Sequence, residues 1–225
     1  MLPGLYGAIT GAVGASGGSV PFTGFRSSNM TVTSGTSATI TLPTGATAGD
    51  QLWLFRECTN ANNATSGFTT QVSLTGTFVN GLVEYKTLTS GDISTGSIGI
   101  TMVSGAVGGA VWAVCLKGVP GTIVTTNSAD FHRDGGGGGT TRSITTVENY
   151  NSGDFVMLFA AQRDSSATAP TPSIGSLDQT TTGAPAASGY LITSASPGGT
   201  TLSCTWTYHT SISNGSFDGI VIVRA

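Results

Sequence analysis

Apolar and polar residues alternate in short runs along most of the chain, and turns rich in Gly, Thr and Asn separate the runs. Alternation with a period of two predicts β-strands with one buried face, and unbroken apolar runs predict central strands. No segment keeps an apolar period of 3.6 residues, so we expect almost no helix. The expected strands cover residues 29–33, 38–42, 52–57, 72–74, 82–88, 97–103, 110–116, 143–147, 155–160, 190–193, 202–208 and 220–223.

The second half of this pattern repeats the first half. Residues 37–43 lead through Gly49-Asp50 into an apolar run, as residues 142–147 lead through Gly153-Asp154 into another. The matches continue in the same order, with 80–85 against 188–192, 96–102 against 200–206, and 109–114 against 218–223. A period of this length indicates two blocks of several strands rather than a short-repeat solenoid.

We therefore predict an all-β fold, a jelly-roll-like β-sandwich built from two pseudo-repeated strand blocks. The blocks cover about residues 30–118 and 140–225, with a linker at about 119–139. One block alone would leave two bare edges, whereas both together close two sheets around a common core. A single sandwich over residues 26–225 is thus favoured, and the second choice is two packed sandwiches split near Gly135.

Residues 1–25 carry no charge but hold many large apolar side chains. A signal peptide needs a basic start, which is absent, and Gly and Ser interrupt what would otherwise be a membrane helix. We interpret the segment as an extended N-terminal anchoring arm that orders on a neighbouring subunit; the alternative is a disordered tail. Phe25 belongs to the same apolar set, and the residues expected to dock are Leu2, Leu5, Tyr6, Ile9, Val13, Val20 and Phe22.

Charge is scarce in this sequence. Only 8% of the 225 residues are charged, against roughly 25% in an average soluble protein, and the net charge is −3. Because no basic stripe exists, we expect no nucleic-acid partner, and we expect no membrane insertion. With 34 glycines and 38% hydrophobic residues, the chain suits many short strands that surround a core.

Three cysteines, Cys58, Cys115 and Cys204, lie far apart in expected strands. Their odd number and wide spacing argue against a disulfide framework and against a zinc site. We expect buried free thiols in a protein made in a reducing cytoplasm, with one bridge between two of them as the alternative.

The sequence offers few candidate catalytic residues. His132 lies between Asp130 and Asp134, but five glycines follow at residues 135–139, so we expect a mobile connection there rather than a Ser-His-Asp site. The same three side chains are the alternative metal set, since carboxylate and imidazole suit divalent ions. The glycine run lacks the Lys-Ser/Thr of a phosphate loop. We expect no enzyme, no metal and no cofactor.

Several acidic residues follow glycine at expected turns. Asp50 and Asp154 occupy equivalent positions in the two blocks, and Asp92 follows Gly91 in the same way. Aspartate commonly closes a turn by accepting hydrogen bonds from the backbone nearby. We therefore interpret these carboxylates as turn residues.

The aromatic residues suggest one binding alternative. Trp53 and Trp112 lie in expected central strands and should be core residues. Trp206 and Tyr208 alternate with polar residues, which favours a buried cross-strand pair. The alternative is a surface pair that stacks on sugar rings. Together with the Asn-rich residues 60–63, such a pair would indicate a carbohydrate-binding or host-receptor-binding module.

Three segments carry a resemblance to a known group of proteins. They are Gly49-Asp50-Gln51-Leu52-Trp53-Leu54-Phe55, Tyr85-Lys86-Thr87 and Leu116-Lys117-Gly118-Val119. With them, residues 30–225 resemble β-sandwich proteins of tailed-bacteriophage virions, such as tail-fibre, tail-tip or capsid-surface proteins. The resemblance implies a non-enzymatic structural role in a virion, after synthesis in the bacterial host cytoplasm. It also implies other virion proteins as partners and a homo-oligomer, with a trimer favoured.

Overall fold

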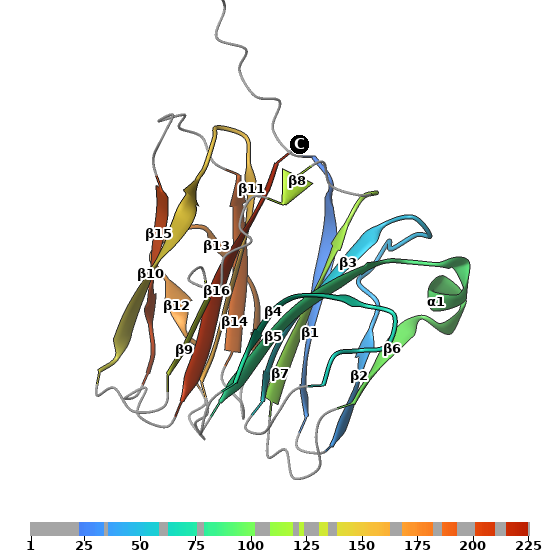
Figure 1. Cartoon of the computed structure of the whole chain (residues 1–225), viewed down its shortest axis with the longest axis horizontal. Coiled ribbons are helices and arrows are strands. Elements are labelled where there is room, and N and C mark those ends of the chain that lie inside the picture. Colours follow the sequence, from blue (N-terminus) through green and yellow to red (C-terminus); the bar gives the residue numbers. More distant parts are fainter. Residues whose placement is uncertain are drawn as a thin grey trace, which may run out of the picture.

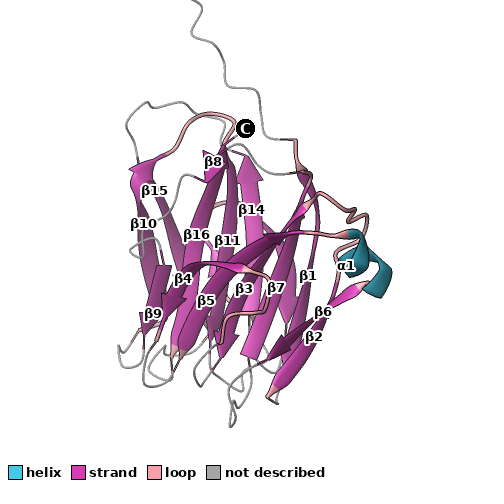
Figure 2. Ribbon diagram, turned by 45° about the vertical axis from the view of Figure 1, so that its right-hand side comes forward, coloured by secondary structure: helices cyan, strands magenta, loops and turns pink. Residues whose placement is uncertain are grey.

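The computed structural model describes residues 23–33, 36–58, 63–75, 79–101, 109–118, 122–123, 131–134, 139–162, 168–181, 186–192, 201–209 and 215–224. Over these ranges the chain forms antiparallel sheets and one short helix (Figure 1, Figure 2). The predicted all-β sandwich fold is confirmed. In this part of the chain no helix has the length and apolar character needed to cross a membrane.

The first block contains one large sheet and one small sheet. The large sheet has the order β1-β7-β3-β5-β4, and β2 pairs with β6 in the small sheet. The elements are β1 (Phe25–Thr33), β2 (Ser37–Thr41), β3 (Gln51–Cys58), β4 (Thr69–Leu74), β5 (Asn80–Thr87), α1 (Ser90–Thr95), β6 (Ser97–Thr101) and β7 (Gly109–Leu116).

The second block repeats this arrangement. Its large sheet has the order β13-β14-β11-β16-β8, with β9 also paired to β16, and its small sheet has the order β10-β15-β12. The elements are β8 (Thr122–Ile123), β9 (Phe131–Asp134), β10 (Thr141–Asn149), β11 (Phe155–Gln162), β12 (Thr171–Pro172), β13 (Ser176–Thr181), β14 (Ala186–Ile192), β15 (Thr201–Thr207) and β16 (Ser216–Arg224). The large sheets of the two blocks therefore have the same strand order, as the repeated sequence pattern predicts, and the small sheet of the second block has the additional strand β12.

The expected linker supplies an edge of the second large sheet. Residues 122–123 pair with one end of β16 and residues 131–134 pair with its other end. In the first block the single strand β1 runs along the whole of β7. Two short strands, β8 and β9, thus form the sheet edge in the second block that the single long strand β1 forms in the first. The expectation of a mobile connection is wrong for residues 131–134, because they belong to this sheet.

The sheets stack as four layers, seen from left to right in Figure 1 as β10–β15, the two large sheets, and β2–β6. Along β3, Trp53 and Phe55 enter the core between the large sheets, while Leu52 and Leu54 enter the core under β2 and β6. A third core lies between β10–β15 and the second large sheet. The central strands are apolar on both faces because both faces are covered.

The two large sheets meet through equivalent residues. Phe55 lies five residues after Asp50, Phe159 lies five residues after Asp154, and the two rings are 5.9 Å apart. At the margin, Ser28 of β1 donates a hydrogen bond to Asp178 of β13. Since β13 corresponds to β4, the opposite edge of the first sheet, the blocks pack like two subunits of an isologous dimer.

The structure also contains elements that were not expected. They are the strands β8, β9, β12 and β13 and the six-residue helix α1. Phe25, expected in the arm, begins β1, and its ring stacks on Phe155 at 5.5 Å. The described body therefore already includes the last residue of the predicted arm.

Candidate functional site

A polar groove lies on the outer side of the first block, beside α1. It has a volume of about 500 Å³, within the range of roughly 300–1,000 Å³ common for small-molecule and cofactor sites. It is lined by residues from the segment 63–68, by residues of β6, by Lys86 of β5 and by Asp92 of α1. Its lining residues are Asn63, Ala64, Thr65, Ser66, Phe68, Lys86, Asp92, Ser97, Ile98, Gly99 and Thr101.

An ion pair crosses this groove from a strand to the helix. Lys86 Nζ lies 2.9 Å from Asp92 Oδ1 and 5.4 Å from the centre of the Phe68 ring. The other carboxylate oxygen, Oδ2, accepts hydrogen bonds of 2.8 Å from both the N–H and the hydroxyl of Thr89. Thr89 and Asp92 thus form a capping box that starts α1, and Gly96 ends it in the left-handed conformation. Burial raises the pKa of Asp92, but bonds from Thr89 and Lys86 outweigh it and lower that pKa.

A second, fully buried ion pair holds the wall formed by residues 63–68. Arg56 Nη2 lies 3.1 Å from Glu84 Oε1, and both side chains are wholly buried. Glu84 accepts a 2.9 Å hydrogen bond from the backbone N–H of Thr65 and another bond from its hydroxyl. Arg56 also donates to the carbonyl oxygen of Asn63. Burial lowers the pKa of Arg56, and Glu84 opposes that change.

The groove can therefore bind through hydrogen bonds rather than through charge. Its lining offers hydroxyl, amide and backbone groups around a single Lys–Asp pair whose charges cancel. Such a surface suits a neutral polar ligand or an uncharged peptide more than a strongly charged one.

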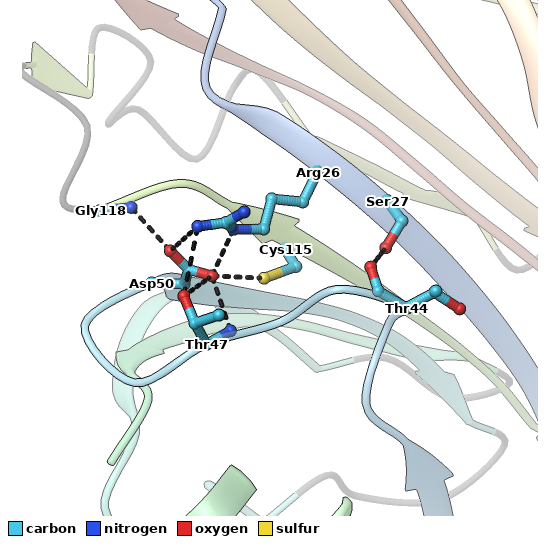
Figure 3. A network of polar contacts seen from close by, with 7 residues as sticks. All are labelled: Arg26, Ser27, Thr44, Thr47, Asp50, Cys115 and Gly118. Atoms are coloured by element: carbon cyan, nitrogen blue, oxygen red, sulfur yellow. Dashed lines mark hydrogen bonds and ion pairs between the residues drawn. The ribbon is translucent and has the colours of Figure 1, made fainter. Parts of the chain in front are cut away.

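Asp50 anchors a second polar network, at the turn before β3 (Figure 3). Its carboxylate lies 2.5 Å from Arg26 Nε and accepts hydrogen bonds from Thr47 N (2.8 Å) and Gly118 N (3.0 Å). Burial alone would raise the pKa of Asp50, but the bonds from Arg26, Gly118 and Thr47 lower it to about 2. The network ties β1, the turn and the end of β7 together, so Asp50 has the structural role predicted for it.

Asp154 repeats this arrangement in the second block. It accepts a 2.8 Å hydrogen bond from Asn151 N, the counterpart of the bond from Thr47, and pairs with Arg224 at 2.8 Å. The arginine here comes from the end of β16, whereas Arg26 comes from β1. The hydrogen bond to Asp154 raises the pKa of Arg224. The predicted turn roles of Asp50 and Asp154 are confirmed, whereas Asp92 caps the start of helix α1 instead of closing a turn between strands.

The three cysteines are buried free thiols, as expected. Burial, and after it the nearby Asp50 carboxylate, raises the pKa of Cys115 to about 12. Burial likewise raises the pKa of Cys204. Both therefore remain protonated and poorly nucleophilic at neutral pH.

The aromatic residues lie in the cores. Trp53 and Trp112 are fully buried between the large sheets, as predicted. Trp206 is 0% exposed and Tyr208 2% exposed in the outer core of the second block. Tyr208 donates a 2.8 Å hydrogen bond to the buried Asp218, and burial, followed by Asp218, raises its pKa well above the ordinary value. Both side chains are thus buried, as favoured, but Trp206 lies opposite Arg142 and Pro172 on the neighbouring strands rather than in a cross-strand pair with Tyr208. The sugar-stacking alternative for Trp206 and Tyr208 is wrong because neither ring faces solvent.

The remaining candidate residues are those of the possible metal set, the arm and the Asn-rich segment. His132 and Asp134 lie on the β9 backbone, and Asp130 lies outside the described residues. No group of three or more His, Cys, Asp or Glu that could hold a metal occurs in the described ranges. The docking residues Leu2, Leu5, Tyr6, Ile9, Val13, Val20 and Phe22 all lie outside the described part, as do residues 60–62 of the Asn-rich residues 60–63.

The groove itself was not predicted from the sequence. Two signals point toward it in retrospect. Arg56 and Glu84 interrupt otherwise apolar central strands, and the spacing of Thr89 and Asp92 matches a capping box. Comparison of the chain with protein-family models, with curated proteins and with solved structures finds no match.

Proposed function

We propose that this protein is a non-enzymatic structural component of a tailed-phage virion. Residues 1–22 dock it to the particle, and the β-sandwich is exposed at the tail or capsid surface. It is made in the bacterial host cytoplasm, and it assembles there with other virion proteins and with copies of itself, most simply as a trimer.

One observation carries this proposal. The uncharged, apolar N-terminal stretch leads directly into Phe25, the first residue of β1, and β1 is an edge strand of a body with its own cores. Apolar side chains gain free energy when a partner surface covers them, by roughly 25 cal/mol for each Å² removed from water. A segment of this kind fits attachment to a neighbour, and the low charge of the whole chain fits a crowded protein assembly.

The resemblance of residues 30–225 to tailed-phage β-sandwich proteins supports the same function. The segments that carry it now have structural roles, since Gly49-Asp50 forms the turn of the Asp50 network and residues 51–55 belong to β3, which is buried along its whole length. These roles are architectural, which is consistent with a structural protein.

Deletion of residues 2–22 tests the proposal. The deletion stops short of Phe25, because that ring packs in the central core. The truncated protein should fold with the circular dichroism spectrum of a β protein, but purified particles assembled with it should lack it. A full-length variant with Leu5→Asp and Ile9→Asp should be lost from particles in the same way, and it keeps the assay informative if the deletion fails to fold. Particles that contain either variant at the normal amount would contradict the proposal.

A further inference from the structure

The groove beside α1 borders an open strand edge. Among the described strands β6 pairs only with β2, residue for residue from Ser97 to Thr101. On its other side, four of its five residues line the groove (Ser97, Ile98, Gly99 and Thr101). An unpaired edge presents backbone N–H and C=O groups that can bind an added strand.

In the second block an extended segment pairs with the equivalent strand edge. There β15, the counterpart of β6, pairs with β10 on one side and with β12 on the other. Ser173 N donates a 2.8 Å hydrogen bond to the carbonyl oxygen of Thr205, and Thr205 N donates a 2.8 Å bond to Ser173 Oγ. The same sheet edge is therefore covered by an extended segment in one block and borders a groove in the other.

The covering segment has a composition that the N-terminal residues share. Residues 169–173 of the second block, Ala-Pro-Thr-Pro-Ser, are small and uncharged. Residues 1–22 are also uncharged and rich in small residues. The groove suits an uncharged segment of either kind. Its only charged lining residues in the described part are Lys86 and Asp92, whose charges neutralise each other. Fully extended, 22 residues span roughly 70 Å, enough to reach a neighbouring molecule.

We propose that the groove is the docking site for the N-terminal arm of a second copy of this chain. A stretch of residues 1–22 adds to the open edge of β6, as β12 adds to β15, and the subunits are joined by β-augmentation. This inference rests on the proposed function, since it names the place where the arm binds.

Cysteine cross-linking between two full-length chains tests the docking. One chain carries Gly99→Cys, where a side chain meets no atom within 4 Å and is exposed in the groove. The other carries a single arm cysteine, at Ala8, Ala12 or Ser16 in turn. The native thiols Cys58, Cys115 and Cys204 are buried, so a short bismaleimide should react mainly with the introduced thiols. We expect at least one arm position to give a heterodimer on a denaturing gel.

The matched control places the cysteine at the equivalent position of the second block. Ser203 of β15 corresponds to Gly99 of β6, is exposed, and does not line the groove. Chains with Ser203→Cys should cross-link to the arm at least fivefold more slowly than chains with Gly99→Cys. Equal yields at the two positions would overturn the proposal, and so would links that form only when both cysteines are in one chain.

Two further measurements separate this inference from its alternatives. Filling the groove with Gly99→Arg in the full-length chain should abolish the cross-link of a Thr101→Cys chain to the arm and lower particle incorporation, whereas Ser203→Arg should do neither. If arm deletion blocks incorporation but Gly99→Arg does not, the arm docks elsewhere and only this inference fails. Glycan-array binding that Gly99→Arg removes, without arm cross-linking, would assign the groove to carbohydrate and overturn the proposal.

Discussion

Asp50 and Asp154 close equivalent turns, yet each is held by an arginine from a different strand. Arg26 reaches Asp50 from β1, and Arg224 reaches Asp154 from the end of β16. The carboxylate position is thus common to both blocks, while the cation that stabilises it differs. A buried carboxylate that accepts several hydrogen bonds can be stabilised by a single arginine among its donors. The strand that supplies this arginine can therefore differ between the blocks while the turn itself is retained.

The first prediction concerns the pH dependence of stability. The pKa of Asp50 is about 2 in the folded protein and near 4 in an unfolded chain. The depressed pKa stabilises the fold above pH 4, and this contribution is lost as the pH falls from about 4 to 2. We expect Asp50→Asn to lower the free energy of unfolding at pH 7 by about 2 kcal/mol and to flatten its pH dependence between pH 4 and 2. Urea unfolding at a series of pH values measures both.

Thr47→Val is the control for this experiment. It removes the hydroxyl that donates to Asp50 at 2.9 Å but keeps the backbone donor of the same residue. Its pH profile should lie between those of the native protein and Asp50→Asn. An unchanged acid profile in Asp50→Asn would show that this carboxylate does not stabilise the fold.

The second prediction concerns the buried pair below the groove. Removing one member of a buried ion pair leaves the other charge uncompensated, which costs roughly 3–5 kcal/mol. Glu84→Gln should therefore destabilise strongly, because Arg56 is wholly buried and its Nε and Nη1 have no hydrogen-bond partner among the described residues. The double variant Arg56→Met, Glu84→Leu should be less destabilising than Glu84→Gln alone.

Lys86→Met is the control, because it breaks the partly exposed pair with Asp92, and it should cost at most about 1 kcal/mol. Equal stabilities for Glu84→Gln and Lys86→Met in chemical denaturation would contradict this account.

At the scale of elements, burial decides which strands the sequence pattern can predict. The central strands β3, β7 and β11 were expected within two residues of their observed ends, because coverage on both faces requires unbroken apolar runs. The edge strand β13, with the sequence SLDQTT, has no such pattern, and its extended form comes from pairing with β14. Helix α1 is too short for a helical period, although its capping box is visible in the sequence.

The groove could not be predicted for a related reason. It depends on where residues 63–68 lie relative to β6, and these segments are distant in sequence. Residues 63–68 are held in place by hydrogen bonds to Arg56 and Glu84. Whether these two side chains meet across β3 and β5 depends on the strand register. Local patterns predict strands well, but they do not specify which loop a buried charge will hold.

The third prediction uses two strand glycines as a matched pair. The Phe217 ring of the second block lies so close to Gly81 of β5 that an added Cβ would overlap it. At Gly99 of β6 an added Cβ would meet no atom within 4 Å. Gly81→Ala should lower the free energy of unfolding by about 1–3 kcal/mol through overpacking, whereas Gly99→Ala should change it little. Equal effects in urea denaturation would show that the large sheets do not pack closely at Gly81.

At the scale of the whole molecule, the two blocks behave as subunits joined by a covalent tether. The sequence repeat predicts two equivalent blocks, but it does not predict that their large sheets face each other with Phe55 against Phe159. Most of the central core comes from this contact, to which the first block contributes tryptophan, phenylalanine and valine side chains and the second block phenylalanine, methionine and valine side chains. Neither block can therefore keep the inner face of its large sheet from water without the other.

Cutting the chain between the blocks tests this account most directly. A specific protease site can be inserted between Gly118 and Thr122, after β7 and before β8, which already pairs within the second block. After cleavage the halves should elute together as one species in size-exclusion chromatography and unfold in a single thermal transition, because the packed large sheets hold them. Separation into two folded halves, each with its own transition, would contradict the shared core.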